Sequence, residues 1–229
     1  LSLVPDFLDH VDQLLIKTDK RLIPLFKRTF GDRIEYIDKN EIIDESEYDF
    51  HIAMGSLPRY LRTSITSFEK AKRLKLEVDK NRSNELRSKL TDSRYEKIVG
   101  ISWKSESLKA TNKSLSLEQF ILEIYSPKIR FVCLQYGDVS EEIKYVREKH
   151  GIEICEVKEI DKFNDIDQLA ALMAACDEVV STGSVTVHLA GAIGIKSNIL
   201  VPVNNLFYLG INEHTSCWYP SLKLFRQLK

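Results

Sequence analysis

Apolar runs and amphipathic stretches alternate regularly over the second half of the chain. From residue 98 onwards, each apolar run of strand length is followed by a longer stretch with apolar residues at helical spacing. This alternation predicts a parallel sheet with helices on both faces and right-handed crossovers. The predicted strands cover residues 98–103, 129–134, 152–157, 178–181 and 197–201, and the predicted helices cover residues 115–125, 140–150, 166–176 and 185–193.

The first part of the chain has a shorter pattern. Residues 13–17 and 33–37 are strand-like, and a helix ending at Gly31 is expected between them. Residues 48–53 predict another strand, and the resulting β-α-β-β order is half of a Rossmann-like layer. Residues 64–97 carry charges of both signs, which predicts a solvated pair of helices. We therefore expect an N-terminal domain with a helical linker over residues 1–92 and a second domain over residues 93–229.

The composition and net charge of the chain limit the kinds of molecule that we expect it to bind. The 229 residues are 43% hydrophobic and 29% charged, which is typical of a globular protein with one large or two small cores. Lys and Arg total 33 against 34 Asp and Glu, so the formal net charge is -1. No overall positive field exists to attract nucleic acid or an anionic membrane. An anionic ligand would have to be bound locally.

The lack of targeting signals in the sequence and the spacing of the cysteines predict a soluble cytoplasmic protein. No apolar stretch approaches the roughly 20 residues of a membrane helix, and residues 1–7 lack the features of a signal peptide. Cys133, Cys155, Cys176 and Cys217 are widely spaced and form neither a zinc pattern nor a disulfide framework. We expect them to be reduced core residues, three of them within apolar runs.

Small, polar or cationic residues follow the predicted strands. Ligands of open parallel sheets collect beyond the carboxyl ends of the strands, near the point where the strand order reverses. This edge is therefore where we expect a binding site. The residues in question are Trp103, Lys104 and Ser105, then Gln135, Tyr136, Gly137 and Asp138, then Thr182, Gly183 and Ser184, and finally Pro202, Val203, Asn204 and Asn205.

The most specific feature is the sequence VVSTGSVTVHLAGAIG, in which a buried strand breaks at Thr182 and a helix of small residues begins. Gly183 removes side-chain bulk where the backbone could approach a ligand, and Ser184 could cap the helix. The free N–H groups of Val185 and Thr186 would then face a bound diphosphate.

Five further residues are candidates for donor binding, and for four of them a structural interpretation is also open. His188, one turn into this helix, could donate to a phosphate or sugar, or be an ordinary core histidine. Lys104 could offset charge on a diphosphate leaving group or be a solvated surface lysine, and Lys113 competes for the same role. Asp165 and Asp167 could bind ribose hydroxyls or cap a helix. No HExxH, Cys–His, GxSxG or Walker pattern supports metal catalysis or serine-type acyl transfer.

Several sequence blocks together resemble a known family. IVGISWKS, KSLSLEQF, FVCLQYGD, DIDQLAALMAACDEVVSTGSVTVHLAGAIG and CWYPSLKLFRQ occur in the order found in the glycosyltransferase domain that follows tetratricopeptide repeats in many bacterial proteins. That domain is similar to family 9 heptosyltransferases and, more distantly, to O-linked N-acetylglucosamine transferases. Residues 3–32 and 51–62 look like its N-terminal half, so the resemblance covers nearly the whole chain.

The resemblance implies a GT-B fold, an α/β architecture of two Rossmann-like domains with mostly parallel sheets. The acceptor-side domain comes first and is incomplete here, and the donor-side domain comes second. The implied activity is metal-independent hexosyl or heptosyl transfer from a nucleoside-diphosphate sugar to a glycan, lipid or protein acceptor. No cofactor, nucleic-acid partner or membrane span is implied, and tetratricopeptide repeats are expected upstream.

Carried over residue by residue, the resemblance implies a donor site at the strand ends. Trp103 and Lys104 fall at the donor diphosphate, Gln135 at the next strand end, and Asp165 with Leu169 near the nucleoside. Trp218 and Arg226, in the closing segment, are expected to be structural. The complete donor-binding set comprises Trp103, Lys104, Ser105, Lys113, Gln135, Asp165, Thr182, Gly183, Ser184, Val185, Thr186 and His188.

Two departures from the family pattern bear on catalysis. Gly183 stands where the family commonly has Asp and sometimes a small residue, and where the family has Asp this chain would lack a polar contact to the donor. The family's Gly-rich loop, with an acidic residue near the acceptor, is expected upstream of Leu1, together with the first strand. These departures leave an alternative open, namely a degenerate GT-B module that binds a nucleotide sugar or a protein partner without catalysis.

Overall fold

The structure is a computed structural model that describes residues 2–73, 75–105, 115–202, 209 and 214–227. The chain divides into two compact units, Leu1–Glu77 and Val78–Lys229. The division falls before the helix of residues 80–90, which therefore lies in the second unit.

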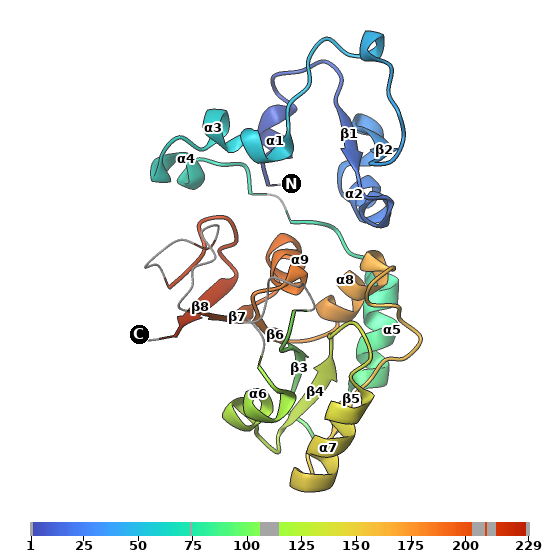
Figure 1. The fold of residues 1–229 in the computed structure, drawn as a ribbon, viewed down its shortest axis with the longest axis vertical. Helices are drawn as coiled ribbons and strands as arrows, with labels where there is room; N and C mark the ends of the chain where they lie inside the picture. The colour runs from blue at the N-terminus through green and yellow to red at the C-terminus, as the bar shows by residue number, and fades with distance from the viewer. Residues whose placement is uncertain (1, 74, 106–114, 203–208, 210–213, 228–229) are drawn as a thin grey trace. The chain divides into compact units, whose positions relative to one another are not determined.

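The first unit contains a parallel strand pair joined by a helix (Figure 1). Strands β1 (Leu15–Thr18) and β2 (Glu35–Asp38) flank a short 3-10 turn, η1 (Lys20–Leu22), and helix α2 (Ile23–Phe30). Asp19 caps η1 by accepting a hydrogen bond from the backbone N–H of Arg21. Gly31 ends α2 with a φ of 64°, a value that side chains with a Cβ rarely adopt. The predicted β-α-β order is confirmed.

The strand predicted over residues 48–53 is wrong, because these described residues form no strand. Phe50 in this segment is 94% exposed, so the alternation of side chains there buries nothing against a neighbouring strand. The remaining elements of the unit are short: α1 (Val4–Phe7), η2 (Gly31–Arg33), η3 (Glu45–Glu47), η4 (Met54–Ser56), α3 (Pro58–Leu61) and α4 (Ile65–Glu69).

The second unit contains a six-stranded, all-parallel sheet in the order β5-β4-β3-β6-β7-β8. From the middle of the sheet, β3, β4 and β5 follow one another towards one edge, and β6, β7 and β8 follow one another towards the other edge. The strand order therefore reverses between β3 and β6. This is the strand order of dinucleotide-binding Rossmann folds. The strands are β3 (Lys97–Ser102), β4 (Ile129–Cys133), β5 (Ile154–Cys155), β6 (Glu178–Thr182), β7 (Ser197–Val201) and β8 (Leu222–Arg226).

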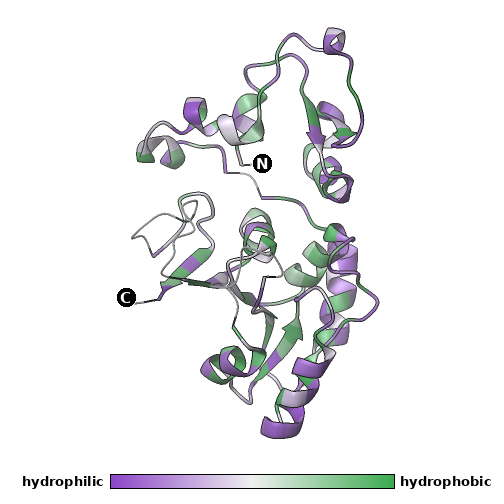
Figure 2. Ribbon diagram, viewed as in Figure 1, coloured by the Kyte–Doolittle hydropathy of each residue, from purple (hydrophilic) through white to green (hydrophobic). Residues whose placement is uncertain are grey.

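Helices cover both faces of this sheet. Helices α6 (Leu117–Ile124) and α7 (Ser140–His150) share a core with the odd-numbered residues of β3. Helices α5 (Lys80–Leu90), α8 (Ile166–Ala174) and α9 (Val185–Ile193) lie on the other face (Figure 1). Figure 2 shows hydrophobic strands inside and a largely hydrophilic α5 outside.

Gly100 allows close packing on the α8 side of β3. A Cβ atom built on Gly100 would lie 2.5 Å from Cδ1 of Leu134 and 3.3 Å from Sγ of Cys176. Burial also raises the pKa of the Cys176 thiol to about 12, so this cysteine stays a neutral core residue. Cys133 is buried as well, whereas Cys217 is exposed and does not belong to the core.

Strand β8 was not predicted. It pairs with β7, and its buried residues Leu222 and Leu224 alternate with the exposed residues Lys223 and Phe225. That alternation is a strand signal readable in the sequence. With β8 included, the expected α/β class with mostly parallel sheets is confirmed, with two strands in the sheet of the first unit and six in that of the second. No helix in the described part of the chain is long and apolar enough to cross a membrane.

Candidate functional site

The carboxyl ends of strands β3, β4 and β6 lie next to one another, at the point where the strand order reverses. β3 pairs with β4 on one side, with Ile101 opposite Cys133, and with β6 on the other, with Ser102 opposite Ser181. The sequence-predicted residues that follow these strands therefore lie along one edge of the sheet. They are Trp103, Lys104 and Ser105 after β3, Gln135 after β4, and Thr182, Gly183 and Ser184 at the end of β6.

Gln135 links the ends of β3 and β4. Its side chain is buried, and Oε1 accepts hydrogen bonds from the Ser102 hydroxyl at 3.0 Å and from the backbone N–H groups of Trp103 and Lys104, each at 3.2 Å. Nε2 donates to the carbonyl oxygen of Tyr136 at 3.3 Å. The amide is thus satisfied within the protein, and it sets the course of the chain that carries Lys104.

Lys104 is paired with a carboxylate. Its Nζ lies 2.5 Å from Oε1 of Glu142, which is in the first turn of α7. The other oxygen of Glu142 accepts a hydrogen bond at 2.8 Å from the indole N–H of Trp103, whose ring is fully buried. Lys104 is therefore neither a fully solvated lysine nor an uncompensated cation, because Glu142 offsets its charge. The sequence analysis missed Glu142, since an acidic residue in a first helical turn is ordinary.

The N-terminus of α9 contains two buried hydroxyls without partners. Thr182 is 3% exposed and Ser184 is 8% exposed, and neither Thr182 Oγ1 nor Ser184 Oγ has a hydrogen-bond partner among the described residues. Ser184 occupies the N-cap position with extended backbone, yet its side chain makes no capping hydrogen bond. The predicted N-cap position is therefore confirmed, but the capping hydrogen bond is absent. A buried hydroxyl left without a partner costs about 1–3 kcal/mol, so this arrangement calls for an explanation.

The backbone at the same place provides further donors. The first N–H groups of an α-helix have no partner within the helix, and the helix dipole places partial positive charge there. Val185 and Thr186 are the first residues of α9; Val185 is 63% exposed and Thr186 is buried. Gly183, between these two residues in the sequence, is also buried and has no side chain. Hydroxyl and amide donors around a glycine are suited to an anion such as phosphate.

His188 lies one turn into α9, against the C-terminal segment. Its Nδ1 is 3.3 Å from the Tyr219 hydroxyl, and the two rings meet edge to face with centroids 5.8 Å apart. Burial lowers the pKa of His188 below its usual value, which favours the neutral imidazole. A Cβ atom on Gly191, one turn further along, would lie 2.3 Å from Cγ of Tyr219. Tyr219, which the sequence analysis did not single out, thus packs into a hollow on α9.

The remaining candidates have structural roles or lie outside this edge. Asp165 accepts a hydrogen bond from the backbone N–H of Gln168 at 3.0 Å, which confirms its capping of α8. Arg226 donates to the carbonyl oxygen of Leu209 at 3.0 Å, as expected for a structural residue. Lys113 lies outside the described residues. Within the described ranges, no cluster of three or more His, Cys, Asp or Glu side chains could hold a metal ion.

Sequence comparison gives one long match to a curated protein. No family model matches the chain. Protein FlbA of Caulobacter vibrioides is 30% identical over 243 residues, and the match covers 98% of this chain. It covers 40% of FlbA, so this chain spans well under half the length of that relative.

Structure comparison gives matches to two solved glycosyltransferase structures. A glycosyl transferase of family 9 from Veillonella parvula has a TM-score of 0.50 at 16% identity, over 95% of this chain and 57% of that chain. The ADP-heptose LPS heptosyltransferase II of E. coli has a TM-score of 0.49 at 14% identity, over 69% of this chain and 46% of its own. At such identity the Veillonella structure bears on the fold alone. Together with the strand order of the second unit, it shows that this chain has the GT-B-type fold found in family 9 glycosyltransferases.

Proposed function

We propose that this chain carries the donor site of a glycosyltransferase that moves a hexosyl or heptosyl group from a nucleoside-diphosphate sugar to an acceptor hydroxyl. One observation carries the proposal: the unpartnered hydroxyls of Thr182 and Ser184 at the N-terminus of α9, beside the strand-order reversal. The GT-B-type fold supports it, because this sheet edge is where α/β folds of this strand order bind nucleotides.

In the proposed complex, the donor diphosphate lies at the start of α9. Phosphate oxygens accept hydrogen bonds from the hydroxyls of Thr182 and Ser184 and from the N–H groups of Val185 and Thr186. These contacts satisfy the two hydroxyls that have no partner in the structure. Lys104 lies on the neighbouring strand end and adds a positive charge if the diphosphate displaces Glu142 from it.

The transfer itself needs negative charge to be stabilised on the leaving group. The acceptor oxygen attacks the anomeric carbon, the bond from that carbon to the diphosphate oxygen breaks, and the nucleoside diphosphate leaves. Helix-terminal N–H groups and Lys104 stabilise the charge that develops on the departing oxygen, without a metal ion. A base takes the proton of the acceptor hydroxyl, and we assign that base to no residue of this chain.

A second function, donor binding without catalysis, is favoured by two specific features. Glu142 already neutralises Lys104, and Gly183 provides no carboxylate beside the donor. Such a module would hold a nucleotide sugar or a protein partner. The tetratricopeptide repeats and the cytoplasmic location suggested by the sequence stay predictions under either function.

The decisive experiment measures donor binding and donor turnover separately. UDP-, GDP- and ADP-sugars are titrated calorimetrically into the 229-residue chain and into the full-length gene product, and sugar release is followed with each. Saturable binding with turnover in the full-length protein supports the transferase. Tight binding without turnover contradicts catalysis and supports the binding module. Binding of no donor by a folded protein contradicts both.

Alanine variants locate the donor. Ser184→Ala and Thr182→Ala should each weaken binding of the donor that is found. Ser88→Ala is the matched control, because Ser88 is exposed on α5, away from the proposed donor site, and its hydroxyl donates to the carbonyl oxygen of Asn84. Equal affinities for all three variants would place the donor elsewhere.

A further inference from the structure

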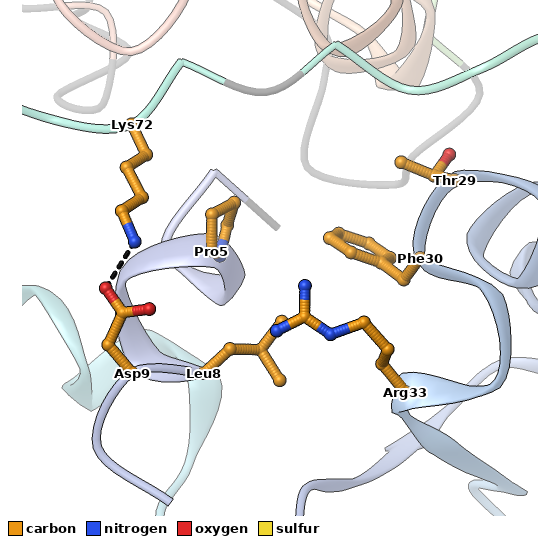
Figure 3. A pocket seen from close by; sticks show the side chains of 7 residues that line it. All are labelled: Pro5, Leu8, Asp9, Thr29, Phe30, Arg33 and Lys72. Atoms are coloured by element: carbon orange, nitrogen blue, oxygen red, sulfur yellow. Dashed lines mark hydrogen bonds and ion pairs between the residues drawn. The ribbon is translucent and has the colours of Figure 1, made fainter.

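The first unit contains a pocket that is distinct from the proposed donor site. It has a volume of about 340 Å³ and lies among α1, the end of α2 and the segment around residue 72 (Figure 3). This volume is at the lower end of the range of small-molecule pockets, about 300–1,000 Å³. The described residues that line the pocket all belong to the first unit.

One side of the pocket is apolar and well supported. Pro5 and Leu8 come from α1 and the residue that follows it, and Phe30 comes from the last position of α2. Leu8 and Phe30 also pack against the small core formed by Val4, Ile16 and Ile34. The apolar wall is therefore held in place by the folded unit, and the Phe30 ring offers a flat surface to a ligand.

The charged side of the pocket carries one more positive charge than negative. Lys72 forms an ion pair with Asp9, and the backbone N–H of Lys72 donates to Oδ1 of Asp6 at 3.3 Å. The hydrogen bond from Lys72 lowers the pKa of Asp9, so this carboxylate stays ionised at neutral pH. Arg33 also lowers the pKa of Asp9 electrostatically, although it forms no ion pair with it. The described lining thus carries two cations, Lys72 and Arg33, against one carboxylate, Asp9.

Arg33 has no hydrogen bond or ion pair with any residue in the described part of the chain. Figure 3 shows its guanidinium between Leu8 and Phe30, on the side of the pocket away from the ion pair of Lys72 and Asp9. A planar guanidinium offers a fork of donors that matches a carboxylate in a bidentate arrangement. Among the described residues of the lining, Arg33 is thus the cation without an ion pair, and it lies beside the apolar wall.

We propose that this pocket binds a small monocarboxylate with an apolar body. The carboxylate pairs with Arg33, and the body lies against Phe30, Pro5 and Leu8. A single negative charge fits the net charge of the pocket, whereas a phosphate dianion would place its second charge near the ionised Asp9. None of the described residues that line this pocket belongs to the proposed donor site.

Phenylacetate is a suitable probe because it combines one carboxylate with one aromatic ring. Its binding to the complete 229-residue chain can be followed by ligand-observed NMR titration, with phenylacetamide as the uncharged analogue and inorganic phosphate as the anion without an apolar body. We expect saturable phenylacetate binding, at least about tenfold weaker for Arg33→Ala, as loss of a charge-assisted hydrogen bond predicts. Arg33→Lys should retain part of the affinity.

Two controls separate the pocket from general effects. Arg59 is an exposed arginine of the same unit outside the pocket, so Arg59→Ala should bind phenylacetate as the wild type does. Thr182→Ala alters the proposed donor site and should also leave phenylacetate binding unchanged. A melting curve for each variant shows that it is folded.

Four outcomes would overturn the proposal: no saturable phenylacetate binding by the wild type, equal affinity of Arg33→Ala and wild type, equal binding of phenylacetamide, or tighter binding of inorganic phosphate that depends on Arg33. None of these outcomes bears on nucleotide-sugar binding by the second unit.

Discussion

The hydroxyl of Tyr219 lies 3.3 Å from Nδ1 of His188 and so joins the C-terminal segment to helix α9. Burial favours the neutral form of His188, and a neutral imidazole has one donor and one acceptor nitrogen. The contact with Tyr219 therefore influences which nitrogen carries the proton. A helix that begins at the proposed diphosphate site thus contacts a segment 31 positions further along the sequence.

Replacing Gly191 should disturb this contact. In Gly191→Ala, the new methyl group would lie 2.3 Å from Cγ of Tyr219, so the ring must move. We expect a loss of about 1–3 kcal/mol in the free energy of unfolding, partly offset by the better helix propensity of alanine. Urea denaturation measures the change. The control is Gly55→Ala, because a Cβ atom on Gly55 meets nothing within 4 Å. Equal stabilities of the two variants would refute the packing of Tyr219 on α9.

Removing the Thr182 hydroxyl should weaken donor binding without lowering the stability of the protein. Valine keeps the shape of threonine without its buried, unpartnered Oγ1. We expect Thr182→Val to leave the free energy of unfolding unchanged or to raise it slightly, because no hydrogen bond is lost. Donor binding should weaken by about 0.5–1.5 kcal/mol, the typical contribution of one hydrogen bond. Urea denaturation and calorimetry give the two values. A marked loss of stability would show that the hydroxyl has a partner in the free protein.

The ion pair between Lys104 and Glu142 should compete with the donor diphosphate. Glu142→Gln removes the charge beside Lys104 but keeps an oxygen that can accept from the Trp103 indole N–H. We expect tighter nucleoside-diphosphate binding by this variant, and weaker binding by about 1 to 3 kcal/mol for Lys104→Ala.

Calorimetry on the single and double variants tests this coupling. In the double variant the gain from Glu142→Gln should disappear, because the cation it frees is absent. If Glu142→Gln gains affinity equally with and without Lys104, the diphosphate does not contact this lysine.

His188 should make stability depend on pH. Burial lowers its pKa in the folded protein below the usual 6.5, so below that pH the unfolded chain binds a proton that the folded chain does not. The free energy of unfolding should therefore fall as pH falls from 6.5 towards the lowered pKa. Urea denaturation on both sides of this window checks the slope. His188→Gln should flatten it, whereas the same change at the exposed His10 should not. Parallel slopes for the wild type and His188→Gln would contradict the assignment.

Much of the second unit was predictable because its signals are local. Helices α7 and α9 and strand β7 have the predicted bounds, since their apolar residues repeat with a clear period and their ends are marked by polar residues or glycine. The residues after β3, β4 and β6 were predictable as one edge, because parallel strands bring their carboxyl ends together. The prediction of a strand over residues 48–53 was wrong, because an alternation of polar and apolar residues does not by itself provide a neighbouring strand to pair with.

The sequence by itself thus determined the order of strands and helices and the kinds of residue at the sheet edge. Only the tertiary structure decided how these residues interact. It paired Lys104 with Glu142 across 38 positions and His188 with Tyr219 across 31, and it left the hydroxyls of Thr182 and Ser184 without a partner among the described residues. These outcomes depend on how α7 and the C-terminal segment pack against the sheet and against α9. Long-range packing of this kind leaves no periodic pattern in the sequence. The regular directions of side chains along a helix or a strand do leave such a pattern.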